Sequence, residues 1–158
     1  MKKTVQKHHL KRLDRVWIDH PIYFLTVATF QRRPIIDCRS AAEILRAEWS
    51  NALTRHGWSV GRYVIMPDHI HFFARPSGKA KPLSDFLRLW KEWTSKRLIR
   101  ECDFNNPVWQ AEFFDHVLRS DENYGAKWAY VRNNPVRAGL ASKPEEWPWQ
   151  GEVEELTL

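Results

Sequence analysis

The segment 64–73, Val-Ile-Met-Pro-Asp-His-Ile-His-Phe-Phe, constrains the fold of this chain more than any other. Two apolar runs meet at Pro67-Asp68, a pair suited to a tight turn because proline fixes its own φ and aspartate can hydrogen-bond to nearby backbone. We therefore expect a hairpin in which one strand ends at Met66 and the next begins near His69. Since side chains alternate along a strand, His69 and His71 share one face while Ile70 lies on the other, core face.

Further strands and helices are predicted around this hairpin. A capped helical pattern, β-branched and aromatic runs, and turn residues between them define the elements. They are strands over 23–30, 58–66 and 69–75, helices over 41–56 and 82–100, short extended pieces at 108–110 and 113–117, and a last helix from Ser120 to Asn134. This order predicts an α+β, ferredoxin-like (RRM-like) antiparallel sheet with helices on one face, to which the last helix is an addition.

The chain of 158 residues fits one main domain with two short flanks. Residues 1–20 form a basic arm, 21–140 the main domain, and 141–158 a tail that is rich in glutamate and contains Trp147 and Trp149. The tail is either packed with solvated charges or folded over a basic surface, where it would compete with a substrate. In the second case, deletion of the residues after Gln150 would raise activity.

The net charge and the cysteine content indicate which binding partners and which cellular compartment the sequence favours. Lys+Arg 25 against Asp+Glu 19 gives a net charge of +6, which favours a polyanionic partner but also fits an ordinary basic protein. Cys38 and Cys102 form no CxxC pair, no segment reads as a secretion signal, and no apolar run approaches membrane-spanning length. We therefore expect a cytoplasmic protein without a membrane partner.

Several basic side chains are candidates for contacts to a nucleic-acid backbone, although a charged face is usually only solvated. Two follow the first strand and four lie on the second helix, whose surface outside its apolar stripe is almost purely basic. These residues are Arg32, Arg33, Arg88, Lys91, Lys96 and Arg97, and Lys127 of the last helix is a further candidate.

The last helix has two different faces. Tyr124, Trp128 and Val131 recur at helical spacing and form an apolar stripe. A separate polar stripe contains Asn123, Lys127, Tyr130 and Asn134. Tyr124 is therefore expected in the core, and Tyr130 is expected to face a site.

Four segments together resemble the REP-associated tyrosine transposases, a branch of the HUH single-strand DNA nuclease superfamily. They are Pro67-Asp68-His69-Ile70-His71, Val108-Trp109-Gln110, Phe113-Phe114-Asp115-His116-Val117-Leu118-Arg119 and Tyr130-Val131-Arg132-Asn133-Asn134-Pro135-Val136-Arg137-Ala138-Gly139. The resemblance covers about residues 20–150 in the right order. It implies that residues 21–140 are an HUH catalytic domain with a ferredoxin-like fold and a nucleophilic tyrosine on its added helix.

The same resemblance implies the roles of the site residues. His69, His71 and Asn134 would be ligands of a divalent metal, Mg²⁺ or Mn²⁺, and Tyr130 would be the nucleophile. Related insertion-sequence transposases usually have glutamine where this chain has Asn134, which keeps the oxygen donor but has a shorter reach. The implied reaction is endonucleolytic cleavage and strand transfer through a 5′-phosphotyrosine intermediate, on a single-stranded DNA hairpin of the REP palindrome type, with no small-molecule cofactor.

Activation of the phenol and two other readings of the chain remain open. A phenol has a reference pKa of about 10, so the metal or Lys127 would have to favour its ionised form. A non-catalytic module that binds single-stranded nucleic acid would need only the basic and aromatic residues. A zinc site for hydrolysis would use His69, His71 and His116, although His116 reads more easily as a structural residue of a strand. Monomer and dimer are equally compatible with the sequence.

Overall fold

The computed structural model describes residues 21–157, so the predicted arm 1–20 lies outside the described residues. Five strands form one antiparallel sheet in the order β4-β1-β3-β2-β5. The strands are β1 (Ile22–Ala28), β2 (Trp58–Ile65), β3 (His69–Pro76), β4 (Phe114–Leu118) and β5 (Gln150–Glu152). The helices are η1 (Phe30–Arg32), α2 (Arg39–Ser50), α3 (Ala52–His56), α4 (Leu83–Cys102), α5 (Asp121–Arg132), α6 (Asn134–Arg137) and η2 (Pro144–Glu146).

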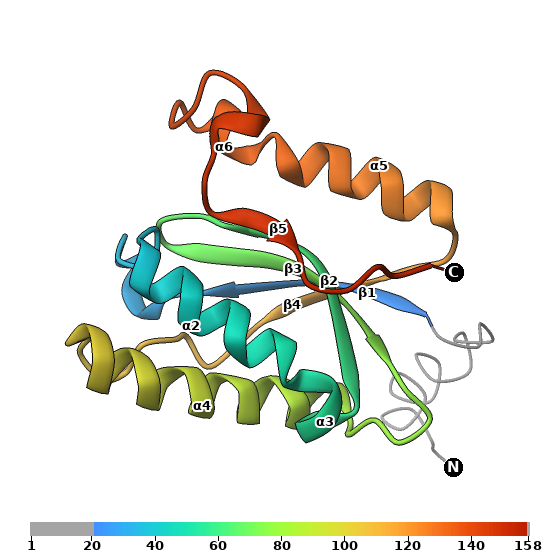
Figure 1. The fold of residues 1–158 in the computed structure, drawn as a ribbon, viewed down its shortest axis with the longest axis horizontal. Helices are drawn as coiled ribbons and strands as arrows, with labels where there is room; N and C mark the ends of the chain where they lie inside the picture. The colour runs from blue at the N-terminus through green and yellow to red at the C-terminus, as the bar shows by residue number, and fades with distance from the viewer. Residues whose placement is uncertain (1–20, 158) are drawn as a thin grey trace, which may run out of the picture.

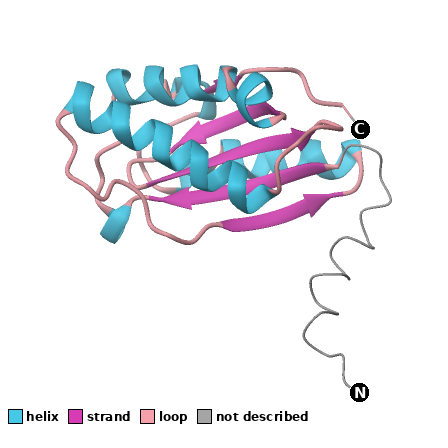
Figure 2. Ribbon diagram, turned by 90° about the horizontal axis from the view of Figure 1, so that it is seen from below, coloured by secondary structure: helices cyan, strands magenta, loops and turns pink. Residues whose placement is uncertain are grey.

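The predicted ferredoxin-like arrangement is confirmed. The order β4-β1-β3-β2 belongs to that fold, and β5 extends the sheet beyond β2. Helices α2 and α4 lie on one side of the sheet, and the added helix α5 lies on the other (Figure 1). Figure 2 shows the two long helices running across the strands on their own side.

The β2–β3 hairpin forms where the sequence predicts it. The Met66 amide donates to the His69 carbonyl at 2.8 Å and closes the turn. Strand β3 then pairs with β1 so that His71 lies opposite Thr26 and His69 opposite Ala28. Because this register fixes the alternation of side chains, both imidazoles lie on the sheet face away from α2 and α4.

The first core fills the space between the sheet and helices α2 and α4. Trp49 of α2 and Trp90 of α4 are both fully buried, and their rings stack with centroids 5.7 Å apart. Phe72 of β3 contacts both rings at 5.1 and 5.7 Å. Since burying one large aromatic side chain stabilises the fold by about 1.5–3 kcal/mol, this cluster anchors both helices.

A second, smaller core lies on the histidine face beneath α5. Phe73 of β3 packs against Tyr124 of α5 with ring centroids 4.8 Å apart, and Val131 is also buried there. Tyr130 is 62% exposed on the same helix. The predicted division of the helix is therefore confirmed, with Tyr124 in the core and Tyr130 outside it.

Several predicted elements differ in detail. The helix expected over 41–56 begins at Arg39 and divides into α2 and α3 at Asn51. The last helix ends at Arg132 instead of Asn134, and the short α6 follows with Pro135 in its first turn, where the missing amide proton is not needed. The extended pieces become β4 and a single bridge between Thr29 and Trp109.

The C-terminal segment is part of the packed structure. Strand β5 pairs with β2, and the buried Trp147 donates from Nε1 to the Ile65 carbonyl at 2.9 Å. Leu156 is buried against the position of Gly61, where a Cβ would come within 2.7 Å of its side chain. The segment thus lies on the β2 edge and the second core, away from the basic face of α4.

Removal of the Trp147 ring should therefore destabilise the protein. We expect Trp147→Ala to lower the free energy of unfolding by about 3–5 kcal/mol, because it leaves a cavity and an unpaired Ile65 carbonyl. Chemical denaturation followed by far-ultraviolet circular dichroism measures the change. Exposed Trp93 of α4 offers the matched control, and Trp93→Ala should cost less than about 1 kcal/mol. Equal losses in the two variants would contradict the second core.

Candidate active site

The two histidines of β3 lie side by side and are held by neighbouring oxygen atoms. Their ring centroids are 4.8 Å apart and their planes are nearly perpendicular, at 79°. Nδ1 of His69 contacts Oδ1 of Asp68 at 2.8 Å, and Nδ1 of His71 contacts Oγ1 of Thr26 at 2.8 Å. Since Nδ1 is used in both rings, Nε2 is the nitrogen that each histidine offers to a further partner.

Both imidazoles are held in the neutral form. Burial lowers the pKa of His71 to about 3, and the positive charges of His69 when protonated, Lys127, Arg32 and Arg137 act in the same direction. Burial also lowers the pKa of His69, against the opposing effect of the Asp68 carboxylate. A neutral imidazole is the form that binds a metal, so the pair is prepared for that role at neutral pH.

Arg32 supports His69 through Asp68. Its Nε lies 3.1 Å from Oδ2 of Asp68, while Oδ1 of the same carboxylate contacts His69. The predicted contact between Arg32 and a phosphate therefore competes with this ion pair. Asp68, which the sequence indicated only as a turn residue, is the residue that orients His69.

Tyr130 is connected to His71 through two intermediate side chains. The ring of Phe24 in β1 stacks on His71 with centroids 5.2 Å apart. Nζ of Lys127 lies 4.5 Å from the centroid of Phe24 and 5.7 Å from that of Tyr130. The predicted polar stripe of α5 therefore faces the part of the sheet that carries the histidines.

Arg137 of α6 is a site residue to which the sequence assigned no role. Its guanidinium carbon lies 4.0 Å from the centroid of the Tyr130 ring, and Nη2 donates to the Tyr130 carbonyl at 2.8 Å. The same nitrogen donates to Oδ1 of Asn134. The Asn134 oxygen, which was predicted to be a metal ligand, thus accepts a hydrogen bond from a cationic side chain, and its role as a ligand stays a prediction.

His116 faces Tyr130 and does not complete a metal centre with the histidine pair. It lies opposite Phe24 in the sheet and lines a cavity of about 380 Å³ with Asn123, Lys127 and Tyr130. Within residues 21–157, no three His, Cys, Asp or Glu side chains group closely enough to hold a metal. The alternative zinc site of His69, His71 and His116 therefore finds no support.

The predicted backbone-binding residues have partners within the protein. Arg33 donates to the carbonyls of Phe30 and Pro107, and Lys91 donates to three backbone carbonyls, where burial lowers its pKa. The remaining pairs are Arg88–Asp85 at 3.5 Å, Lys96–Glu92 at 3.0 Å and Arg97–Glu101 at 2.8 Å. The basic face of α4 is therefore partly neutralised, and its contact with DNA stays a prediction.

The fold and this site together define a class of protein. A ferredoxin-like sheet that carries a His-hydrophobic-His pair, with an exposed tyrosine on a helix over the same face, is the arrangement of HUH-type proteins. The IS200-like transposase family model matches residues 19–134, which is most of the chain. The chain belongs to this family and is an enzyme of the transposase type.

Two relatives agree with this assignment. A REP-associated tyrosine transposase of Escherichia coli K12 is 26% identical over 136 residues, which cover 85% of this chain and 78% of that protein. A solved structure of a REP-associated tyrosine transposase bound to a REP hairpin superposes with a TM-score of 0.68 at 20% identity. That match covers 90% of this chain and 92% of the other, and it establishes the common fold.

None of the helices in residues 21–157 is long and apolar enough to cross a membrane.

Proposed function

We propose that this transposase is a metal-dependent endonuclease and strand transferase that acts on single-stranded DNA beside a hairpin. In this proposal Tyr130 is the nucleophile and His69 and His71 hold the metal. One observation carries the proposal: the exposed Tyr130 lies over the sheet face of the histidine pair, linked to it by Phe24 and Lys127. A purely structural tyrosine would not need two cations beside its ring and a neutral histidine pair nearby.

The donor set fits a divalent cation that accepts both nitrogen and oxygen ligands. Two neutral imidazoles supply Nε2 atoms and leave positions for water and phosphate oxygens, which suits Mn²⁺ and is tolerated by Mg²⁺. Asn134 would supply a third ligand if Arg137 released its oxygen. Such a metal would polarise the scissile phosphate and neutralise charge on its oxygens.

Tyr130, Lys127 and Arg137 each have a defined role in the proposed reaction. The phenol of Tyr130 loses its proton to water, and its oxygen attacks the phosphorus and forms a new P–O bond. The bond between phosphorus and the 3′ oxygen breaks, and that oxygen takes up a proton to become a free 3′-hydroxyl. Lys127 and Arg137, which flank the ring, stabilise the negative charge of the phenolate and of the phosphate. Attack by a 3′-hydroxyl on the phosphotyrosine reverses the step and joins strands.

The relatives indicate the kind of substrate. Because the structural relative is bound to a REP hairpin, we propose a palindromic DNA hairpin with a short unpaired recognition sequence beside it. Exposed aromatic rings would stack on unpaired bases and basic residues would contact phosphates. The proposed compartment is the cytoplasm, where Cys38 and Cys102 remain free thiols.

A denaturing gel of the protein with labelled hairpin DNA tests the proposal. Incubation with Mn²⁺ or Mg²⁺ should give a covalent protein–DNA band together with a fragment that ends in a 3′-hydroxyl. Cleavage that leaves two free ends without an adduct would show hydrolysis by water and reject the tyrosine mechanism. Binding without any cleavage would reject the reaction as a whole.

Replacement of Asn134 tests whether its oxygen reaches the metal. We expect Asn134→Ala to raise the Mn²⁺ concentration needed for half-maximal adduct formation by about tenfold or more, since one ligand is lost. Neighbouring Asn133 provides the matched control, because Asn133→Ala removes an amide of equal size at the C-cap of α5. A titration of adduct yield against Mn²⁺ measures both variants. The same metal dependence in Asn134→Ala and in the native protein would show that Arg137 keeps the amide.

A further inference from the structure

A cavity of about 200 Å³ lies beside the histidine pair and has no part in the chemistry proposed above. It lies between β1, η1 and the segment that leads into β4, and is lined by Thr26, Ala28, Arg32, Gln110, Glu112, Phe113 and Phe114. Thr26 is the residue that holds His71, and Arg32 holds Asp68, the partner of His69. A group that entered this cavity would therefore lie next to the supports of both histidines.

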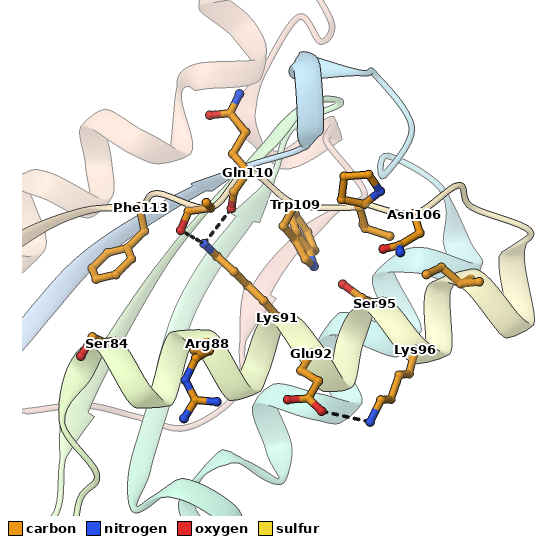
Figure 3. Close-up of a pocket in the computed structure, with 14 residues that line it drawn as sticks. Ser84, Arg88, Lys91, Glu92, Ser95, Lys96, Asn106, Trp109, Gln110 and Phe113 are labelled. Carbon is orange, nitrogen blue, oxygen red and sulfur yellow. Dashed lines mark hydrogen bonds and ion pairs between the residues drawn. The ribbon is translucent and has the colours of Figure 1, made fainter.

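Gln110 is placed in this cavity by the backbone of the sheet. Its amide nitrogen donates to the Ala28 carbonyl at 2.9 Å, and Ala28 is the residue that pairs with His69. The Gln110 side chain points away from Lys91 and α4, whereas Phe113 points toward α4 (Figure 3). Within residues 21–157 the structure shows no hydrogen bond to the Gln110 carboxamide, so its donor and acceptor remain free for a ligand.

Lys91 holds the segment that carries Gln110 from the opposite side. Its Nζ donates to the carbonyls of Gln110, Ala111 and Glu112 at 2.8, 2.9 and 3.2 Å. Figure 3 shows the contacts to Gln110 and Ala111 across a larger cavity of about 800 Å³ between α4 and the segment. All three protons of the ammonium group are therefore used to fix a short irregular segment, which gives the Gln110 side chain a defined position.

Phe114 adds an aromatic surface to the same cavity. It lies opposite Thr26 in the sheet, on the face of the histidines, and its side chain is 58% exposed. An exposed aromatic ring beside a nucleic-acid site is a platform on which an unpaired base stacks. A carboxamide and an exposed ring thus share one small cavity.

The charges of the cavity favour a neutral group over a phosphate. The Arg32 guanidinium, which lines the cavity, is already paired with Asp68 at 3.1 Å. Glu112 contributes a carboxylate to the lining, which would repel a phosphate. A nucleobase has a flat apolar face for Phe114 and a polar edge for Gln110, so it matches both surfaces.

We propose that Gln110 and Phe114 form a subsite for one unpaired nucleobase adjacent to the cleaved phosphate, with Gln110 as a specificity-determining residue. This inference rests on the proposed function, because it requires a DNA strand at the histidine pair. Gln110 bonds to the edge of the base, Phe114 stacks on its face, and Lys91 is a positioning residue. Adenine is the expected base, since a carboxamide can bond to its N6 and N7 together.

Fluorescence of a base analogue tests the subsite directly. Hairpin DNAs with randomised unpaired flanks are first selected by cleavage with the native protein, and each flanking base of a cleaved sequence is then replaced by 2-aminopurine. With Tyr130→Phe protein, which binds without cleaving, we expect quenching at one position. Phe114→Ala in that background should abolish this quenching and weaken binding about tenfold or more. Trp93→Ala, an exposed ring on α4, should preserve both.

Base substitution at the quenched position tests the role of Gln110. The native preference for one base should be about 10- to 100-fold and should fall below about threefold in Gln110→Ala, with preferences at other positions unchanged. Gln110→Glu should instead shift the preference toward cytosine, whose amino group donates to a carboxylate. Cleavage with an unchanged base preference in both variants would overturn the subsite alone. Failure of the native protein to cleave any hairpin in the pool would overturn the proposed function and the subsite with it.

Discussion

Tyr130→Phe is expected to abolish the covalent protein–DNA adduct while hairpin binding remains within about threefold of native. The substitution removes only the hydroxyl oxygen that attacks the phosphorus. Because the ring is retained, its contacts with Arg137 and Lys127 at 4.0 and 5.7 Å should persist. Adduct formation measured on a denaturing gel should fall about a thousandfold or more, since a nucleophile in covalent catalysis has no substitute.

Tyr124→Phe is the matched control for this prediction. Tyr124 lies on the buried stripe of α5, is 5% exposed and packs against Phe73. Its hydroxyl lies beside the Arg62 backbone in the second core, so removal of that oxygen should leave adduct formation unchanged. Loss of the adduct in Tyr124→Phe but not in Tyr130→Phe would show that Tyr124 is the nucleophile and that the proposed assignment to Tyr130 is wrong. Loss in neither would exclude both tyrosines.

Replacement of either histidine of β3 should have the second large effect. We expect His69→Ala and His71→Ala each to lower the cleavage rate about a thousandfold or more at saturating hairpin, because the phosphate would lose the charge stabilisation of the metal. Hairpin binding in the absence of divalent metal should change little, since most of the binding free energy comes from contacts to the DNA backbone. Single-turnover cleavage and gel-shift titration measure the two quantities separately.

His116→Ala is the control that separates a two-histidine site from a three-histidine site. His116 lies on β4 beside Tyr130 and outside the histidine pair. Its removal should therefore leave the metal dependence of cleavage unchanged. A loss as large as that of His71→Ala, together with rescue by Zn²⁺ in preference to Mn²⁺, would instead support the zinc reading of the sequence.

The position of Asn134 shows that helical spacing in the sequence does not always predict which side chains lie together. The spacing of Tyr130 and Asn134 would put both side chains on one side of a continuous helix. In the structure α5 ends at Arg132, Asn134 begins α6, and its oxygen bonds to Arg137. The sequence could place both residues near one site, but the partner of the amide depends on how the chain turns at Pro135.

The C-terminal segment is a second feature whose position the sequence did not decide. Its glutamates and tryptophans allowed either a packed tail or a cover over a basic surface. The structure packs Trp147 into the second core and pairs β5 with β2. Deletion of the residues after Gln150 would remove most of β5 and Leu156, so the expected outcome is lower stability in place of higher activity.

The sequence by itself determined the elements whose signals are local. Alternation along 64–73 predicted the hairpin and the shared face of His69 and His71, and helical spacing predicted that Tyr124 is buried and that Tyr130 lies on a separate polar stripe. These predictions succeeded because turn chemistry and side-chain periodicity depend on residues within one or two turns of chain. The order of the elements was sufficient to predict the ferredoxin-like sheet.

Only the tertiary structure decided which distant residues meet around the histidines. Thr26 reaches His71 across 45 positions of sequence, and Gln110 enters the same face through the pairing of its backbone with Ala28. Lys91, predicted to bind phosphate, instead supports that segment through three carbonyls. Such contacts depend on strand register and on the path of an irregular segment, and both are set by packing of the whole domain, for which no short stretch of sequence carries a signal.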